Sequence, residues 1–142
     1  MSQSNQIKAE SIFRQMYDQD AFSQWLGIEA VEHDIGKSVL KMTIRPEMLN
    51  GFGIAHGGIT FSFADSAFAF ASNSHGRLSV SIETSISHLV ALKAGDVIFA
   101  KAKEIHITHK TGIYTVDVTK SDGTLVAVFK GTVYRKSKEW KI

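Results

Sequence analysis

One stretch of the chain, residues 58–72, has apolar side chains around almost the whole circumference of a helix. A helix without a polar face has to be enclosed by other parts of the protein. We therefore predict a central buried helix over residues 57–72, with the rest of the chain wrapped around it. Its apolar residues are Ile59, Phe61, Phe63, Ala64, Ala67, Phe68, Ala69, Phe70 and Ala71.

After this stretch the hydrophobic period changes to two, which is typical of β-strands. Residues 78–87 alternate between apolar residues on one side and mainly serines on the other. Further alternating runs cover residues 96–108, 113–119 and 125–134, so the later strands should form a meander. The dipeptide Asp122-Gly123 between the last two runs predicts a two-residue hairpin loop.

The region before residue 50 supplies one more helix and two strands. Apolar residues at helical spacing within residues 1–25 predict an amphipathic helix that covers an edge of the fold. Two strand-like runs follow over residues 27–45. This order predicts a single α+β domain over residues 1–142, a hotdog fold in which a curved antiparallel sheet wraps around the central helix.

The composition excludes several classes of function. A net charge of +2 in 142 residues is too small for a nucleic-acid-binding surface. The chain has no cysteine, which excludes disulfides, thiolate metal sites and a cysteine nucleophile. No stretch has the roughly 20 apolar residues of a membrane helix, and residues 1–6 do not resemble a secretory signal. We expect a cytoplasmic protein with no nucleic-acid or membrane partner.

Asp65 is the residue that the apolar pattern does not explain. In a helix its neighbours are Phe61, Phe68 and Ala69, so the carboxyl group should lie among apolar side chains. Such an environment raises the pKa of a carboxyl group and indicates a hydrogen-bonded structural role or a catalytic one. A glycine-rich segment at residues 50–58 favours catalysis, because free N–H groups at a helix N-terminus can stabilise a developing oxyanion.

The most plausible oxyanion donor in that segment is the N–H of Gly57. Gly57 and Asp65 are eight positions apart, which is roughly 12 Å along a helix axis. A reacting carbonyl must lie within roughly 3.5 Å of the atom that attacks it. One chain cannot easily supply both groups to one carbonyl, whereas two antiparallel copies of the helix can. We therefore predict an active site at a dimer interface.

The residues in this region resemble the PaaI-type hotdog acyl-CoA thioesterases, the family of the phenylacetate-degradation thioesterase. The resemblance rests on residues 50–58, Ala64-Asp65-Ser66-Ala67, and the later stretches 110–118 and 126–131. It implies hydrolysis of an aryl-acyl (phenylacetyl-like) or medium-chain acyl-CoA by a homodimer or homotetramer. Coenzyme A would be part of the substrate, and no separate cofactor or metal would be needed.

The resemblance also implies roles for individual residues. Asp65 would be the base or nucleophile, Gly57 the oxyanion donor, and His56 and Asn50 would shape the loop. Ser81 matches a serine that helps to position water in some relatives. The family often has an aromatic residue where this chain has His88, so His88 should line or flank the acyl pocket. The remaining predicted substrate contacts are Gly58, Phe61, Phe68, and the turn Lys110, Thr111 and Gly112, which could face the phosphates of coenzyme A or only solvent.

Other chemistries fit the sequence less well. The loop glycines match neither a dinucleotide fingerprint nor a P-loop, and there is no Gly-x-Ser-x-Gly motif. His106 and His109 should point to opposite faces of a strand, so they are unlike a metal pair. Two alternatives to hydrolysis stay open: an acyl-CoA-binding module without catalysis, and a hotdog dehydratase or hydratase that uses His56 and Asp65.

Overall fold

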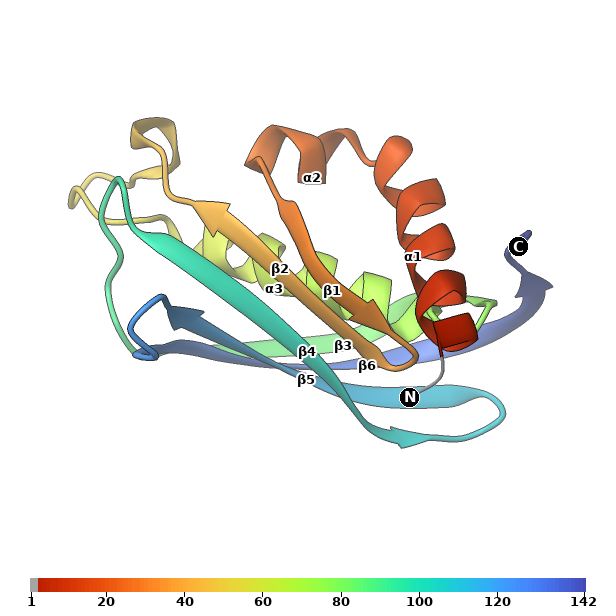
Figure 1. Ribbon diagram of the computed structural model, residues 1–142. Coiled ribbons are helices and arrows are strands. Elements are labelled where there is room, and N and C mark those ends of the chain that lie inside the picture. Colours follow the sequence, from red (N-terminus) through yellow and green to blue (C-terminus); the bar gives the residue numbers. More distant parts are fainter. Residues whose placement is uncertain (1–2) are drawn as a thin grey trace.

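The computed structural model describes residues 3–142 and has the predicted α+β composition (Figure 1). A six-stranded antiparallel sheet curves around one long helix, which confirms the hotdog fold. The elements in chain order are α1 (Gln3–Asp18), α2 (Ala21–Leu26), β1 (Glu29–Asp34), β2 (Lys37–Thr43), the 3-10 helix η1 (Pro46–Met48), α3 (Gly57–Asn73), β3 (Arg77–His88), β4 (Val97–Ile107), β5 (Thr111–Lys120) and β6 (Leu125–Glu139). Residues 1–2 of the predicted N-terminal region lie outside the described residues.

The strand order across the sheet is β1-β2-β4-β5-β6-β3. Strands β4, β5 and β6 form the predicted meander. Strand β3 precedes them in the chain, yet it pairs with β6 at the far edge of the sheet. The chain crosses from β2 to that edge through α3, so the helix lies in the curve of the sheet (Figure 1).

The central helix α3 ends within one residue of its predicted bounds. Its inner face is in the core through Phe63, Ala64, Ala67, Phe68 and Ala71, with exposures between 0% and 2%. The prediction that the helix is buried on all sides is wrong on one side, where the small residues Gly58, Ser62 and Ala69 flank a half-buried Asp65. Small and polar side chains on this face leave it open because they offer little apolar surface to cover.

The N-terminal region forms two helices, where the sequence predicted one. Helix α1 packs on the edge strand β1 through Ile12 and Phe13, in the predicted covering position. The chain then turns, and Asp20 caps α2 by accepting a hydrogen bond from the backbone N–H of Ser23. Helix α2 has six residues, too few for hydrophobic periodicity to show, so the pattern could not separate it from α1.

The loop between β5 and β6 is one residue longer than predicted. Lys120 N donates to Thr124 O at 2.9 Å, and Gly123 N donates to Lys120 O at 3.0 Å. The loop therefore contains Ser121, Asp122 and Gly123, with Gly123 in the left-handed region at φ 90°. This is a turn followed by a left-handed glycine, in which the glycine takes the third loop position.

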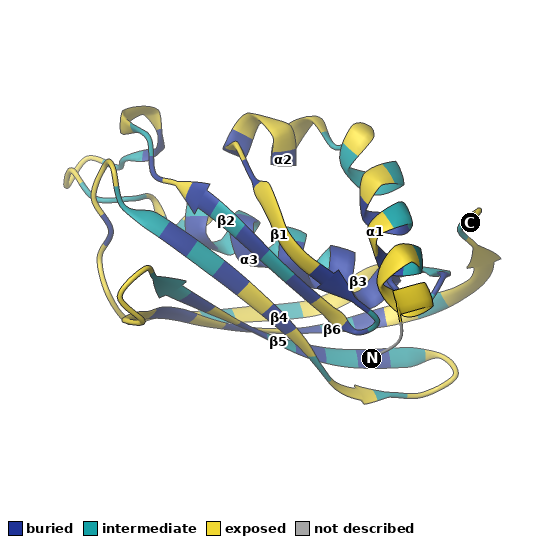
Figure 2. Cartoon of the chain, in the orientation of Figure 1, coloured by how far each residue is buried: buried dark blue, intermediate teal, exposed yellow. Residues whose placement is uncertain are grey.

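Strand β3 is an edge strand with an uncovered apolar side. The side chains of Val80 and Ile82 are 38% and 59% exposed, although Ser79 is buried. The register with β6 shifts between Ser81 and Glu83, which breaks the simple alternation of inner and outer residues. Figure 2 shows alternating buried and exposed residues along the strands, and mostly exposed residues on α2. The protomer alone therefore does not bury the apolar residues of this edge.

Gly131 on β6 is the position where the core tolerates a larger residue least. A Cβ added there would lie 2.6 Å from Cζ of Phe68, whose ring is enclosed by the core. We predict that Gly131→Ala lowers the free energy of unfolding by about 1–3 kcal/mol through overpacking. Gly51→Ala is the matched control, because nothing lies within 4 Å of its added Cβ. Urea unfolding of both variants measures the difference, and equal midpoints would contradict the prediction.

His33 is a buried titratable group beneath α1. Its ring stacks on Phe13 with centroids 4.1 Å apart, and Nδ1 lies 3.1 Å from the hydroxyl of Ser38. Its Nε2 is buried and has no hydrogen-bond partner among residues 3–142. Burial, with a smaller effect of the Arg14 charge, lowers the pKa of His33 from 6.5 to about 4.

This lowered pKa predicts a loss of stability in acid. Between pH 6.5 and about 4 the unfolded chain binds a proton at His33 that the folded chain does not bind. The free energy of unfolding should therefore fall as the pH falls through this range, by roughly 3 kcal/mol in total. His33→Phe keeps an aromatic ring between Phe13 and Phe70 and removes the titration. Urea unfolding at several pH values should give a shallower pH dependence for the variant, and identical slopes would refute the assignment.

Candidate active site

The glycine-rich loop is shaped by the side chains of Asn50 and His56. The Oδ1 atom of Asn50 accepts a hydrogen bond from Phe52 N at 2.9 Å, and Asn50 N donates to Ile54 O at 2.8 Å. His56 caps α3, since its Nδ1 accepts from Gly58 N at 2.9 Å. A neutral His56 therefore carries its proton on Nε2. The structure thus places both residues where they fix the entry into α3.

The first backbone N–H groups of α3 differ in what they bind. The N–H of Gly58 donates to the His56 ring, and that of Ile59 donates to His56 O. Within residues 3–142 no group accepts a hydrogen bond from the N–H of Gly57. This N–H lies at the positive end of the helix dipole, so it is available to an oxygen atom that develops negative charge.

A small hollow of about 280 Å³ opens beside Gly57. His88 at the end of β3 stands over Gly57, with Nε2 only 3.3 Å from the point where a Cβ would lie. Glycine at this position is what allows the imidazole to approach. The structure therefore brings three predicted site residues together in this hollow, namely Asn50, Gly57 and His88.

Asp65 lies on the same helix but not in the same hollow. Asp65 is eight positions after Gly57 on the continuous helix α3, which is roughly 12 Å along the helix axis. Asp65 is half-buried, and burial together with the negative charge of Asp20 raises the pKa of its carboxyl group. A raised pKa makes the ionised carboxylate a stronger base. The predicted separation of the two groups within one chain is therefore present in the structure.

No pattern in the sequence predicted the contact between α2 and the turn of α3 that contains Asp65. Ser23 donates from Oγ to Oδ2 of Asp20 at 2.6 Å, and its Oγ lies 2.8 Å from the hydroxyl of Ser66. Since the proton of Ser23 is directed to Asp20, Ser66 must donate to Ser23. These hydrogen bonds hold Asp20 close to Ser66, the residue that follows Asp65. The N-cap pattern Asp20-x-x-Ser23 could have indicated the start of α2, but not its position on α3.

The other predicted site residues lie elsewhere in the protomer. Ser81 is exposed in the first half of β3, roughly 23 Å from His88 along the strand. Phe61 is partly buried with its ring against Phe129. Phe68 is 2% exposed and lies in the core, so its surroundings do not support the predicted contact with substrate. Gly58 is exposed beside the cap.

The predicted phosphate contact, Lys110, Thr111 and Gly112, covers the end of the turn between β4 and β5 and the first two residues of β5. This turn lies at the opposite end of the sheet from the loop before α3 (Figure 1). Thr111 bonds to Thr108, and Lys110 O accepts from Arg135 N. Gly112 is buried against Tyr114. Within one protomer these residues are therefore not part of the hollow at Gly57.

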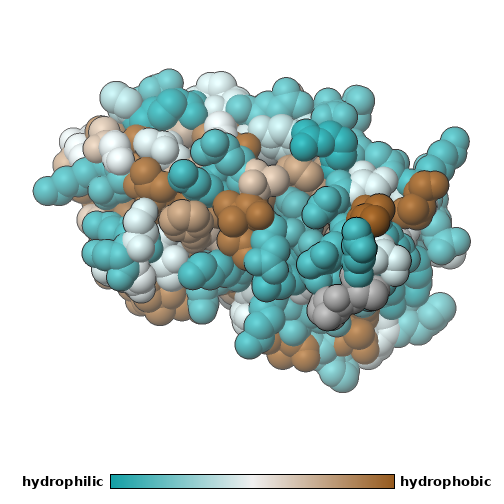
Figure 3. Space-filling model, viewed as in Figure 1, coloured by the Kyte–Doolittle hydropathy of each residue, from teal (hydrophilic) through white to brown (hydrophobic). Residues whose placement is uncertain are grey.

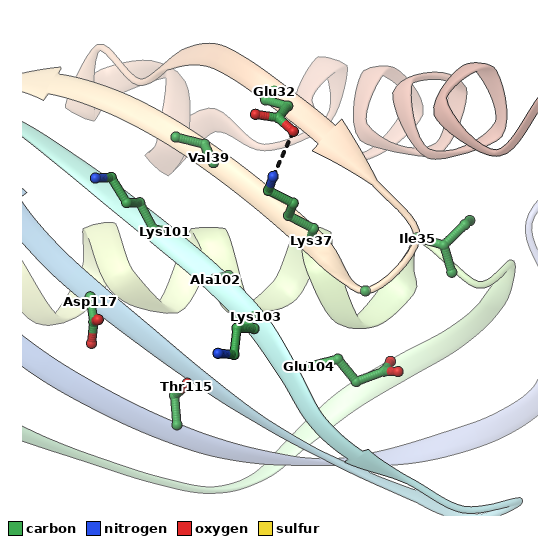
Figure 4. A pocket seen from close by; sticks show the side chains of 11 residues that line it. Glu32, Ile35, Lys37, Val39, Lys101, Ala102, Lys103, Glu104, Thr115 and Asp117 are labelled. Carbon is green, nitrogen blue, oxygen red and sulfur yellow. Dashed lines mark hydrogen bonds and ion pairs between the residues drawn. The ribbon is translucent and has the colours of Figure 1, made fainter. Parts of the chain in front are cut away.

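The outer face of the sheet carries a larger hollow of about 690 Å³. Three lysines and three acidic residues are among its lining residues, and Lys37 pairs with Glu32 at 2.7 Å (Figure 4). In the view of Figure 3, hydrophobic groups on the surface are scattered among hydrophilic ones. None of the predicted catalytic residues lines this hollow. Five of its six charged side chains are exposed, and the sixth, Glu104, is partly buried but bonded to His75 and Tyr114. The hollow therefore lacks the unpaired buried charge that is typical of a catalytic site.

Comparison with known proteins decides the family. The family description "Thioesterase superfamily" matches residues 52–127. The chain belongs to this superfamily. This thioesterase is 39% identical over 120 residues to the acyl-coenzyme A thioesterase PaaI of Escherichia coli, covering 84% of this chain and 86% of the relative. It is 27% identical to a 1,4-dihydroxy-2-naphthoyl-CoA hydrolase of Listeria monocytogenes, covering 80% of this chain and 94% of that protein.

Solved structures agree with this assignment. The E. coli PaaI protein from the phenylacetic acid degradation operon superposes with a TM-score of 0.93 at 36% identity, covering 95% of this chain and 98% of that one. A thioesterase protein from Streptococcus pneumoniae, solved with coenzyme A, gives 0.83 at 27% identity, covering 89% and 98%. The predicted PaaI-type family and the enzyme class, a thioester hydrolase, are confirmed. Within residues 3–142 of this thioesterase, no helix has the length and apolarity to cross a membrane.

The contact through α2 predicts that the charge of Asp20 contributes to the raised pKa of the Asp65 carboxyl. We expect Asp20→Asn to lower the pKa of the Asp65 carboxyl, because the substitution removes the nearby negative charge but still caps α2. Asp18→Asn removes the same charge from an exposed position on α1 and is the control. The carboxyl pKa is measured by NMR titration of the side-chain carbon. Equal shifts in the two variants would rule out a specific effect of Asp20.

Proposed function

We propose that this protein hydrolyses acyl-coenzyme A to a free acid and coenzyme A at a site shared by two protomers. The observation that carries the proposal is the separation of the two reactive groups along α3. The free N–H of Gly57 and the carboxyl of Asp65 are too far apart to act on one carbonyl, as described above. Two antiparallel copies of α3 bring the Gly57 of one protomer to the Asp65 of the other.

Strand β3 offers the surface for such a dimer. It lies at the edge of the sheet, and an exposed edge with apolar side chains tends to pair with another strand. Pairing with the β3 of a second copy would continue the sheet and cover Val80 and Ile82, which are 38% and 59% exposed. A two-fold axis would repeat the contact, as in most homodimers. It would also bring Ser81 of one protomer towards the site of the other. The homotetramer that the family resemblance implies would then pair two such dimers.

The chemistry follows from these two groups. The thioester carbonyl oxygen accepts a hydrogen bond from the N–H of Gly57, which polarises the carbonyl carbon. The carboxylate of Asp65 takes a proton from water while the water oxygen attacks that carbon, or attacks the carbon itself and forms an anhydride that water then cleaves. In both routes the C–S bond breaks and the thiolate of coenzyme A leaves. The raised pKa of Asp65 favours proton abstraction.

For the acyl group we propose an aryl-acyl chain similar to phenylacetyl, or a medium-length chain. Phe61 lies beside Asp65 on α3, and Phe52 in the loop is 90% exposed, so aromatic surface is present near both parts of the site. The names of two relatives, from the phenylacetic acid operon and from naphthoyl-CoA hydrolysis, support an aryl substrate. Such a protein would serve phenylacetate degradation in the cytoplasm. A panel of aryl and straight-chain acyl-CoA substrates at equal concentration, followed by thiol release, tests the preference.

Two inactivating substitutions test the proposed roles of Asp65 and Gly57 separately. Asp65→Asn removes the base, and thiol release should fall by at least about 100-fold. Gly57→Pro removes the backbone N–H of residue 57. The backbone accommodates this proline, because proline is favoured at the first position of a helix and His56 is already extended at ψ 136°. Gly57→Ala adds a Cβ near His88 but keeps the N–H. The extra loss in Gly57→Pro therefore measures the oxyanion donor.

Mixing these two variants tests whether the site is shared. A dimer of one Asp65→Asn chain and one Gly57→Pro chain has one site with both groups intact. After unfolding and refolding of an equal mixture, about a quarter of the wild-type thiol release should return, because half of the dimers are mixed and each has one intact site. If the activity of the mixture stays at the level of the separate variants, both groups act within one chain and the shared site is wrong.

A further inference from the structure

The hollow at Gly57 contains a second group that can donate a hydrogen bond. The ring atom of His88 closest to Gly57 is Nε2, at 3.3 Å from the position of a Cβ, followed by Cε1 at 3.5 Å and Cδ2 at 3.9 Å. The imidazole therefore directs its tip, and not its face, at the first residue of α3. Gly57 and His88 line the same hollow, so the free N–H and the tip of the imidazole both border the space that a bound oxygen can occupy.

Backbone contacts hold residue 88 beside the N-terminus of α3. At the end of β3, His88 pairs with Ala127, and the next residue donates from Leu89 N to Val126 O at 2.8 Å. The following segment is tied to the loop before α3, since Ala55 N donates to Leu92 O at 2.8 Å. Among residues 3–142 no side chain or backbone group forms a hydrogen bond with the His88 ring. The strand fixes the backbone of His88, and the two ring nitrogens are free for a ligand.

We infer that His88 donates a hydrogen bond from Nε2 to the same thioester oxygen that Gly57 binds, and so completes the oxyanion site. The inference rests on the proposed function. A carbonyl oxygen has two lone pairs, so it can accept from the Gly57 N–H and from His88 together. Both bonds strengthen as the oxygen gains charge during attack by water. A phenylalanine at this position would fill the same space without a donor.

The role as a donor predicts a specific kinetic change. In His88→Phe, kcat for acyl-CoA hydrolysis should fall by about 100-fold, the usual effect of one lost oxyanion donor, with a small change in KM. His88→Gln carries an amide Nε2 at a similar reach and should recover most of kcat. Because His88 is exposed and bonded only through its backbone, both variants should fold, which circular dichroism checks. Calorimetry with coenzyme A alone should give equal affinities for wild type and both variants.

The outcomes separate this role from the proposed function. Loss of kcat in His88→Phe with recovery in His88→Gln supports the donor. A kcat within twofold of wild type in His88→Phe, or a loss of similar size in both variants, overturns it and leaves the roles of Gly57 and Asp65 standing. A wild-type protein that releases no thiol from any acyl-CoA overturns the proposed function, and the His88 role with it.

Discussion

The burial of one side of α3 in the curve of the sheet is the interaction on which the rest of the structure depends. Phe63, Ala67 and Phe68 fix the depth and rotation of the helix, and the contact of Phe68 with Gly131 leaves no room for either to shift. With the rotation fixed, Asp65 must face away from the sheet. With the depth fixed, the N-terminus of the helix meets the end of β3, where Gly57 and His88 come together.

The proposed dimer accounts for three features that one protomer leaves uncovered. The edge of β3 carries exposed apolar side chains, one face of α3 is lined by small residues, and the N–H of Gly57 has no partner within residues 3–142. In an isolated chain the exposed apolar edge would be unfavourable, and the N–H of Gly57 would have no role. A second copy related by a two-fold axis would cover the first two and supply the chemical partner for the third. The same contact would then provide both stability and catalysis.

The N-terminal helices add electrostatic control to this arrangement. Burial raises the pKa of the Asp65 carboxyl. The negative charge of Asp20, which α2 holds near Asp65 through Ser23 and Ser66, raises it further. Helix α1 covers His33, whose pKa is lowered by the same kind of burial. Burial thus raises the pKa of the Asp65 carboxyl and lowers the pKa of the His33 imidazole, because in both groups it disfavours the charged form. The raised pKa of Asp65 serves the proposed chemistry, and the lowered pKa of His33 limits the stability of the fold in acid.

The sequence by itself determined the fold class, the family, and the bounds of α3, β3, β4 and β5 to within two residues, whereas β6 runs five residues beyond its predicted end. These depend on periodicity and on a contiguous motif, both of which are local properties of the chain. It also singled out Gly57 and Asp65, since a carboxyl in an apolar helix is visible without coordinates. Only the tertiary structure decided that Phe68 lies in the core, that Asp20 acts on Asp65, and that His88 stands over Gly57. These contacts join residues 31 to 63 positions apart, or depend on the rotation of one helix, and no local pattern encodes such a distance.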